Sequence, residues 1–301
     1  IMKIFDCTTF YNENLMLEVR FNILNDYVDK FVISEAKYSH SGEKKKLNFD
    51  LKRFKEFKNK IIYLTIDNEP DNLIYENNLD QKIESDSEIR KNSIKRIAHQ
   101  RDKLILGLNE AQDDDYIFYS DNDEIPDFSN IDLKKNKSKF IMFKQKLFYY
   151  KFNLYCDRVD WIGTKGCKKK YLESFSLLRE IKTKKYPFFR FDTIFSKNKF
   201  MSLKIIENGG WHFSQLKSPK DIEVKLNNDE VHYEYKLAKK ELPNIEDLVR
   251  RKVIVYDHKA KTSDFKFSKE FKLKTIGMKY MPNFLQNNVN KYSEWFDYDN
   301  N

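Results

Sequence analysis

The chain has 301 residues, of which 40% are hydrophobic and 34% are charged, enough for a substantial core in one large domain or two small ones. Its formal net charge is +9, but the signs are mixed and the lysines are scattered, so we expect no nucleic-acid partner. No apolar stretch approaches the ~20 residues of a membrane span, so we expect no span in this chain. Cys7, Cys156 and Cys167 match no zinc-binding spacing, and without a signal-peptide pattern they indicate a reduced, cytoplasmic protein.

Residues 1–126 alternate between predicted strands and predicted helices. Strands are expected at residues 3–10, 30–36, 61–66 and 116–119. Helices are expected at residues 15–27, 51–57 and 87–111, and a polar loop at residues 67–81. This alternation is typical of a parallel sheet with helices on both faces. The sequence contains neither Gly-x-Gly-x-x-Gly nor a P-loop motif, which argues against dehydrogenases and P-loop proteins.

The predicted helix over residues 87–111 has an apolar side that also carries an arginine. The apolar residues of this side are Ile94, Ile97, Leu104, Ile105 and Leu108. Arg101 is aligned with them, and a buried arginine requires an anionic partner. The alternative is an arginine at the edge of the helix face, with its charged end in water.

The apolar run at residues 116–119 leads directly into a group of acids. The run predicts a buried strand, and Pro126 is expected to prevent its continuation. Asp121 and Asp123 are two residues apart, so in extended backbone their carboxylates would lie on one side and repel each other without a cation. Because ligands of open α/β sheets bind beyond the strands' carboxyl ends, the pattern predicts a Mg²⁺ or Mn²⁺ site for a nucleotide diphosphate. An acidic turn facing water is the alternative.

The second half of the chain has a different pattern. Aromatic, β-prone stretches predict antiparallel strands added to the sheet edge, without clear helices between them, at residues 140–143, 146–153, 193–196 and 203–206. Gly209 and Gly210 permit a tight bend that presents Trp211 and His212, and this histidine is a candidate metal ligand, base or core residue. Helices are expected at residues 219–226 and 245–256, and the aromatic tail at residues 281–298 is expected to pack against the body.

Several short motifs are distributed along nearly the whole chain. They are Phe10-Tyr11-Asn12-Glu13, Leu17-Glu18-Val19-Arg20, residues 28–36, Ser39-His40-Ser41-Gly42 with Lys46-Leu47, Gln100-Arg101-Asp102, residues 120–126 (Ser-Asp-Asn-Asp-Glu-Ile-Pro), and Gly210-Trp211-His212-Phe213-Ser214 with Lys225-Leu226. In this order they resemble glycosyltransferase family 17, the family of the bisecting β-1,4-N-acetylglucosaminyltransferase of N-glycans. The sequence departs from the family after Lys46, where the family often has a proline.

The resemblance implies a GT-A-type α/β fold, with helices on both faces of a nucleotide-binding sheet and a β-rich second half. Residues 1–126 would be the nucleotide-sugar-binding half of one continuous catalytic domain. Residues 127–301 would be the acceptor-binding half with the C-terminal helices. The implied reaction is an inverting, metal-dependent transfer of a sugar, by analogy N-acetylglucosamine, from a UDP-sugar to a glycan acceptor.

The same resemblance implies roles for particular residues. Asp121 and Asp123 would hold Mn²⁺ or Mg²⁺, with His212 as a third ligand, and the ion would neutralise the leaving diphosphate. Asp121 and Arg101 would lie at the donor diphosphate. The residues expected beside the uridine are Glu35, Ser41 and Gly42.

An inverting displacement also requires a group that takes the proton of the acceptor hydroxyl. Glu124 is the candidate because it adjoins the metal site, and Asp192 and Asp221 are rivals. The alternative for Glu124 is a structural acid that accepts backbone N–H bonds. Two other functions stay open: a nucleotidyltransferase on a similar scaffold, and a non-catalytic protein that binds a nucleotide or a glycan.

Overall fold

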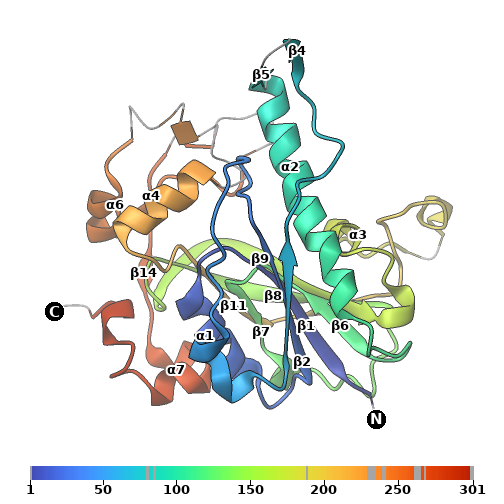
Figure 1. Cartoon of the computed structure of the whole chain (residues 1–301). Coiled ribbons are helices and arrows are strands. Elements are labelled where there is room, and N and C mark those ends of the chain that lie inside the picture. Colours follow the sequence, from blue (N-terminus) through green and yellow to red (C-terminus); the bar gives the residue numbers. More distant parts are fainter. Residues whose placement is uncertain are drawn as a thin grey trace.

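The computed structural model describes residues 2–298, except 79–80, 84–85, 188, 229–234, 237, 239–241, 261–265 and 268. Its main feature is a large mixed sheet with the strand order β3-β2-β1-β6-β9-β8-β11-β7 (Figure 1). These strands are β1 (Ile4–Phe10), β2 (Lys30–Ala36), β3 (Ile61–Ile66), β6 (Tyr116–Tyr119), β7 (Glu124–Pro126), β8 (Phe140–Tyr149), β9 (Leu154–Lys168) and β11 (Gly210–Ser214). Two short strands extend the sheet, β10 (Leu203–Ile206) beside β8 and β14 (Lys274–Thr275) beside β9.

The sheet has a parallel part and a mixed part. The strands β3, β2, β1 and β6 are parallel, as predicted for residues 1–126. β8 covers the predicted strand at residues 140–143 and the first part of the one at 146–153, and it is antiparallel to β9, which was not expected; β11 runs parallel to β8. β9 is antiparallel to β6, so the second half is added to the β6 edge of the parallel part, as predicted.

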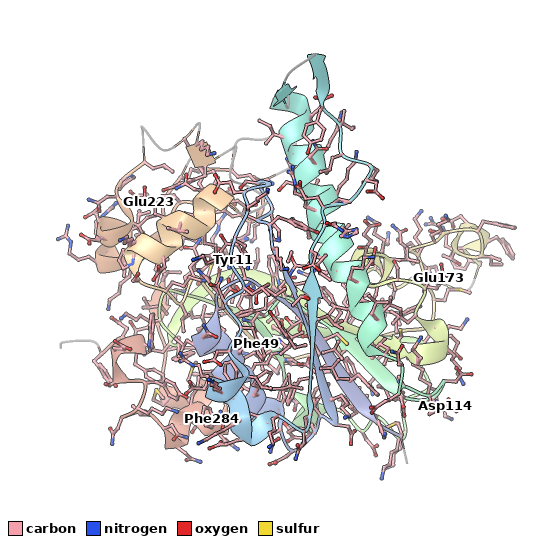
Figure 2. All side chains as sticks on the ribbon, in the orientation of Figure 1. Tyr11, Phe49, Asp114, Glu173, Glu223 and Phe284 are labelled. Atoms are coloured by element: carbon pink, nitrogen blue, oxygen red, sulfur yellow. The ribbon has the colours of Figure 1, made fainter. Side chains whose placement is uncertain are left out.

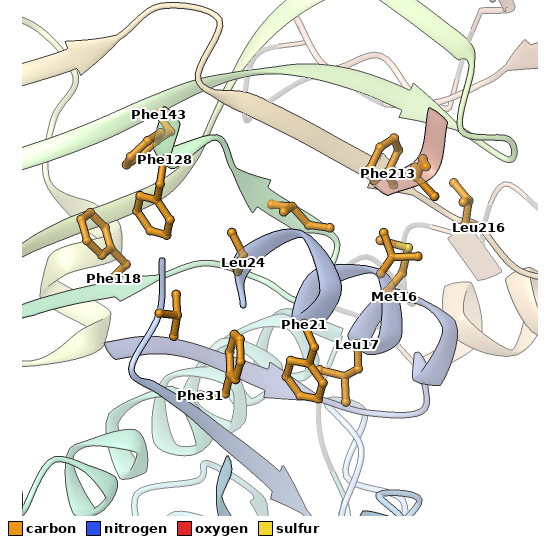
Figure 3. Close-up of a cluster of buried hydrophobic side chains, with 14 of the residues drawn as sticks. Met16, Leu17, Phe21, Leu24, Phe31, Phe118, Phe128, Phe143, Phe213 and Leu216 are labelled. Atoms are coloured by element: carbon orange, nitrogen blue, oxygen red, sulfur yellow. The ribbon is translucent and has the colours of Figure 1, made fainter. Parts of the chain in front are cut away.

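Helices cover both faces of the sheet. α1 (Asn14–Leu24) and α7 (Asn283–Asn287) pack on one face; α2 (Asp86–Asp102), η2 (Lys103–Gly107) and α3 (Phe175–Glu180) pack on the other (Figure 1). Along β2 the side chains alternate between the faces, Phe31 and Ile33 toward α1 and Val32 toward η2, which explains the continuous apolar run of this strand. Figure 2 shows Phe49 and Phe284 on the α1 face, where both pack against the core. Figure 3 shows the centre of this core, including Met16, Leu17, Phe21, Leu24, Phe31 and Phe118.

Most predicted elements are confirmed. The predicted strands at residues 30–36, 61–66 and 116–119 are β2, β3 and β6. The further helices are η1 (Leu51–Phe57), α4 (Pro219–Asn228) and α6 (Ile245–Arg251). α6 ends earlier than predicted because Lys252 adopts a left-handed conformation with φ of 55°, after which β12 (Val253–Ile254) pairs with β13 (Phe271–Lys272).

Two predictions about elements are wrong, and the elements β9, β11 and α3 were not expected. The predicted loop at residues 67–81 contains β4 (Glu76–Asn78), which pairs with β5 (Gln81–Ile83). Residues 193–196 form no strand, because Thr193 belongs to the turn η5 (Phe191–Thr193) and none of the four pairs with a strand in the described part of the chain. α3 was not expected at all, since six residues are too few to show a helical period.

The predicted apolar side of the long helix is also wrong in part. Ile94 and Ile105 are exposed, whereas Leu104 and Leu108 are buried after the helix has tightened into η2. The buried side chains of α2 itself are polar: Asn92, Ser93, Arg96 and Gln100. Gln100, for example, donates to the carbonyls of Phe10 (3.3 Å) and Ser34 (2.9 Å) at the ends of β1 and β2. α2 thus buries groups that satisfy the backbone beside the strand ends.

The C-terminal tail packs on the body, as predicted. Leu285, Tyr292 and Phe296 are buried in the core that contains α1. The cysteines are free, and all three are buried. Within the described ranges, no helix combines the length and the apolar character that crossing a bilayer requires.

Candidate functional site

A cavity of about 550 Å³ lies where β6 ends, and a tight turn forms part of its wall. The N–H of Glu124 donates to the carbonyl of Asp121 (3.0 Å), so the backbone turns here and then enters β7. The prediction of extended backbone is therefore wrong, and Pro126 ends β7 rather than β6. Asp121 and Asp123 both line the cavity, but they face different partners.

A buried arginine holds this turn in place. Arg20 of α1 is fully buried and forms an ion pair with Asp6 of β1, with 2.6 Å between Nη2 and Oδ1. Its guanidinium also donates to Oγ of Ser120 (2.7 Å) and to the carbonyl of Glu124 (2.8 Å). Because these bonds reach both ends of the turn, Arg20 fixes the position of the acids between them.

Asp121 faces two arginines. Its Oδ1 accepts from the hydroxyl of Tyr119 (2.8 Å), and its Oδ2 accepts from Arg179 of α3 (3.0 Å). Arg101 donates to the same hydroxyl (2.9 Å) and lies 4.0 Å from Oδ1. Burial raises the pKa of Asp121, but Arg179 and Arg101 outweigh it and lower the pKa overall. Arg101 therefore has the anionic partner that its place on the helix predicted.

Asp123 faces a histidine and a lysine from the second half of the chain. Nε2 of His212 lies 3.5 Å from its Oδ1, and Nζ of Lys225 lies 3.5 Å from its Oδ2. Burial raises the pKa of Asp123, but Lys225 and His212 lower it well below its usual range. Nδ1 of His212 is buried and has no hydrogen-bond partner among the residues that the structure describes. Among the predicted metal ligands, the structure thus brings Asp123 and His212 together.

The predicted glycine bend positions His212. Gly210 has φ of +125°, and a Cβ at this position would lie 2.2 Å from the carbonyl oxygen of Ile125. Only glycine allows β11 to approach β7 this closely. The resulting register places His212 opposite Glu124.

Glu124 is fully buried, and both of its carboxylate oxygens accept hydrogen bonds. Arg179 binds the two oxygens in a bidentate pair, each at 2.8 Å. Nε1 of Trp161 donates to Oε1 (2.6 Å), and the N–H of Asp121 donates to Oε2 (3.0 Å). This arrangement suits a carboxylate that positions Arg179 and the acidic turn.

A second ion-pair group joins the two halves of the chain. Glu13, which follows β1, lies 3.1 Å from Lys217 and 4.0 Å from Lys225, and accepts the N–H of Asn12 (3.0 Å). Lys225 of α4 therefore lies between Glu13 and Asp123. Burial raises the pKa of Glu13, but Lys217 and Lys225 outweigh it, and the pKa falls from 4.5 to about 2.

The remaining wall of the cavity is aromatic and apolar. The ring centroid of Trp161 lies 4.8 Å from the ring centroid of His212 and 5.7 Å from that of His258. Nε2 of His258 pairs with the hydroxyl of Tyr149 (2.5 Å), and burial with the nearby His212 lowers the pKa of His258 to about 4. Further apolar residues of this wall are Tyr150, Leu226, Leu248, Ile254, Val255, Tyr256 and Phe267. The cavity thus has a charged end and an aromatic end.

The residues predicted beside the uridine do not line the cavity. Glu35 is fully buried and accepts from the hydroxyl of Tyr63 (2.8 Å) and from two backbone N–H groups. Ser41 bonds to Ser39, and Gly42 packs against Arg96 of α2.

Neither rival for the base lines the cavity. Asp192 pairs with Arg190 (2.7 Å) on the exposed segment between α3 and β10. Asp221 accepts from Ser218 (2.6 Å) at the start of α4.

Several residues of the site had no role predicted from the sequence: Trp161, Arg179 and Lys225 line the cavity, and Arg20 supports the acidic turn from outside the lining. Arg20 and Lys225 both lie in the short motifs named above. Each is a charged residue on the apolar side of a predicted helix, and this pattern could have indicated a buried ion pair. Trp161 is one of only three tryptophans in the chain, but the sequence does not indicate which residue it contacts. Arg179 has no local signal, because its partners Glu124 and Asp121 lie 55 and 58 residues away.

Comparison with known proteins identifies the family of the chain. The family described as Glycosyltransferase family 17 matches residues 1–292. No curated protein matches the chain. Among solved structures, one similar chain is the inositol-1-phosphate CTP transferase from T. maritima, with 12% identity and a TM-score of 0.32, covering 75% of this chain and 96% of that chain. A TM-score this low carries no argument about fold or activity.

Proposed function

The chain belongs to glycosyltransferase family 17, and we propose that it transfers a sugar from a nucleoside diphosphate sugar to a glycan acceptor. The observation that carries this proposal is the charged end of the cavity beyond β6, where carboxylates and guanidinium groups meet. A diphosphate requires cations around it, and Arg101 and Arg179 bring two guanidinium groups to this end of the cavity. The donor that we propose is a UDP-sugar, and the analogy with the family points to UDP-N-acetylglucosamine. We also propose that the fold is of the GT-A type.

The side chains at this end fit a divalent metal ion. Oδ1 of Asp123 and Nε2 of His212 are 3.5 Å apart, so both can bind one ion at a ligand distance of about 2.1 Å. Among the described residues, no group of three or more His, Cys, Asp or Glu side chains is placed to hold a metal ion by itself. We propose that Asp123 and His212, with Asp121 as the further candidate, hold Mn²⁺ or Mg²⁺, which would neutralise the leaving diphosphate.

The other side chains of the cavity have proposed roles in binding and orientation. Glu124 holds Arg179 by two hydrogen bonds, so the guanidinium is fixed before the donor arrives. The rings of Trp161 and Tyr256 offer flat apolar faces for the acceptor sugar. Glu124 remains the candidate for the group that takes the proton of the acceptor hydroxyl. Because both of its carboxylate oxygens already accept hydrogen bonds, the alternative role is to position Arg179 and the acidic turn.

Thermal stability with donor candidates tests this proposal. The melting temperature is measured with UDP-N-acetylglucosamine, other UDP-sugars and GDP-sugars, each with Mn²⁺ or with EDTA. A ligand that binds only the folded chain raises the melting temperature by mass action. We expect a rise with UDP-N-acetylglucosamine and Mn²⁺ that EDTA and Asp123→Asn both abolish, and release of UDP when glycan acceptors are added.

Asp132→Asn is the matched control, because Asp132 is an exposed acid that pairs with Lys135 outside the cavity. It should respond to the donor like the wild type. Stabilisation by another nucleotide sugar would keep the class of reaction and change the donor. A folded wild type that responds to no nucleotide sugar would overturn the proposal.

A further inference from the structure

The segment between α3 and β10 carries large apolar side chains on its surface. The exposed fractions are 71% for Phe191, 66% for Ile194 and 89% for Phe195, and Met201 is also exposed. The N–H of Ile194 donates to the carbonyl of Phe191 (3.1 Å), so the first two belong to one turn and Phe195 follows directly. Exposed apolar groups this close together indicate a surface that a partner covers.

This segment is a closed loop that extends from the body. The N–H of Lys182 donates to the carbonyl of Asn198 (2.8 Å) at its base, and the hydroxyl of Thr193 donates to the carbonyl of Arg190 (2.7 Å) near its tip. Figure 1 shows the loop in yellow, extending to the right beyond α3. Figure 2 labels Glu173, just before α3, on the same side of the molecule. We call residues 182–201, as far as the structure describes them, the aromatic loop.

Basic residues accompany the apolar ones. Six of them lie between residues 182 and 201: Lys182, Lys184, Lys185, Arg190, Lys197 and Lys199. Asp192 is the one acid between residues 182 and 201, so the formal charge of this stretch is +5. Asp192 pairs with Arg190 (2.7 Å) and Lys199 (3.4 Å), and the side chains of Lys182, Lys184, Lys185 and Lys197 are exposed. A partner must therefore offer both an apolar layer and negative charge.

We propose that the aromatic loop docks onto a lipid bilayer that contains anionic phospholipids. In such a contact Phe191, Ile194 and Phe195 enter the boundary between headgroups and acyl chains, while the lysines bind the phosphates above them. A second copy of this chain is a less suitable partner, because a symmetric contact would bring the same +5 loop against itself. The proposal concerns a surface contact and does not depend on the proposed sugar transfer.

Flotation of the full chain with lipid vesicles tests this proposal. Vesicles of pure phosphatidylcholine are compared with vesicles that contain about 30% phosphatidylglycerol, at about 0.1 M salt. We expect binding to the anionic vesicles and little binding to the neutral ones. Phe191→Ser with Phe195→Ser should lower the partition coefficient at least about tenfold, because two exposed rings no longer enter the lipid. Lys184→Glu with Lys185→Glu should lower it about tenfold or more through lost attraction.

Two matched controls change the same kinds of group elsewhere. Tyr280→Ser removes an exposed aromatic side chain near α7, and Lys134→Glu with Lys135→Glu makes the same change of charge on two other exposed lysines. Both controls should bind anionic vesicles like the wild type, and all variants should keep the wild-type melting temperature. The proposal is overturned if the folded wild type ignores anionic vesicles or if the loop variants bind them normally. It is also overturned if light scattering shows a dimer that the loop variants separate, because the loop would then bind a second copy.

Discussion

At the scale of single residues, Arg20 is the side chain on which the acidic turn depends most. It is buried against Asp6 and bonds to Ser120 and Glu124 at the two ends of the turn. Removing one partner of a buried ion pair leaves the other charge uncompensated, which costs far more than losing an exposed pair. The charge of this residue is thus used to support the fold rather than to contact a ligand.

Arg20→Ala should lower the free energy of unfolding by about 3–5 kcal/mol, because Asp6 stays buried without its partner. The control is Arg53→Ala, which removes a half-exposed partner of Glu18 at 3.3 Å and should cost less than about 1 kcal/mol. Urea unfolding followed by circular dichroism measures both. Equal costs for the two variants would show that the buried pair is not a main support of the turn.

At the scale of elements, β11 is the strand that brings the second half of the chain to the acids. It pairs with β8 on one side and with β7 on the other, and Gly210 permits the close approach to β7. The two consecutive glycines predicted a bend, but the strand that the bend approaches was not predictable. Its register depends on β7, which is only three residues long.

Gly210→Ala should destabilise the chain by about 1–3 kcal/mol, because alanine rarely adopts φ of +125° and its Cβ would meet the carbonyl of Ile125. The displaced strand carries His212, so the response to Mn²⁺ with a nucleotide sugar should weaken as well. Gly277→Ala is the control, since no atom lies within 4 Å of its Cβ position, and it should change stability by less than about 0.5 kcal/mol. Urea unfolding compares the two, and wild-type stability for Gly210→Ala would contradict this account of the bend.

Elements were predictable where local pattern and tertiary burial agree. β2 and β6 are buried on both faces, and the apolar runs at residues 31–33 and 116–119 allowed their bounds to be predicted correctly. α2 was misjudged because Asn92 and Gln100 are buried for their hydrogen bonds to backbone groups far away in the sequence. No local periodicity reveals such partners.

At the scale of the whole molecule, the cavity is a joint product of both halves of the chain. The first half supplies Glu13, Asp121 and Asp123, and the second half supplies His212 and Lys225. The sequence predicted Asp121, Asp123 and His212 as members of one site, but it gave Glu13 no role. It left Lys225 without a role, because its partners are acids that only the fold brings near.

This junction between the halves should appear in the pH dependence of stability. The pKa of Glu13 is about 2 in the folded chain against an ordinary value of 4.5, so the folded state binds fewer protons than the unfolded state between these values. The stabilisation from this carboxylate is fully present above about pH 4.5 and is lost as the pH falls toward 2. Glu13→Gln should therefore flatten the fall in unfolding free energy in this window, by up to about 1.4 kcal/mol per pH unit.

Urea unfolding at a series of pH values measures this slope. The control is Glu110→Gln, which removes one carboxylate from an exposed side chain. If Glu13→Gln and Glu110→Gln give the same slope, the ion pairs of Glu13 with Lys217 and Lys225 do not contribute to acid stability.

Arg20 bonds to residues that are far away in the sequence, and such contacts affect how fast the chain folds. Arg20 and Glu124 are 104 residues apart, and Lys217 bonds to Asn12 across 205 residues. Contacts between such distant segments form slowly, because the intervening chain must first be closed into a loop. On a ribosome, the chain up to residue 126 already contains the acidic turn, but it has neither β9 to pair with β6 nor the histidine and lysine that face Asp123. The cavity is therefore completed late in biosynthesis, and a chain that is released early carries the acids without the pocket.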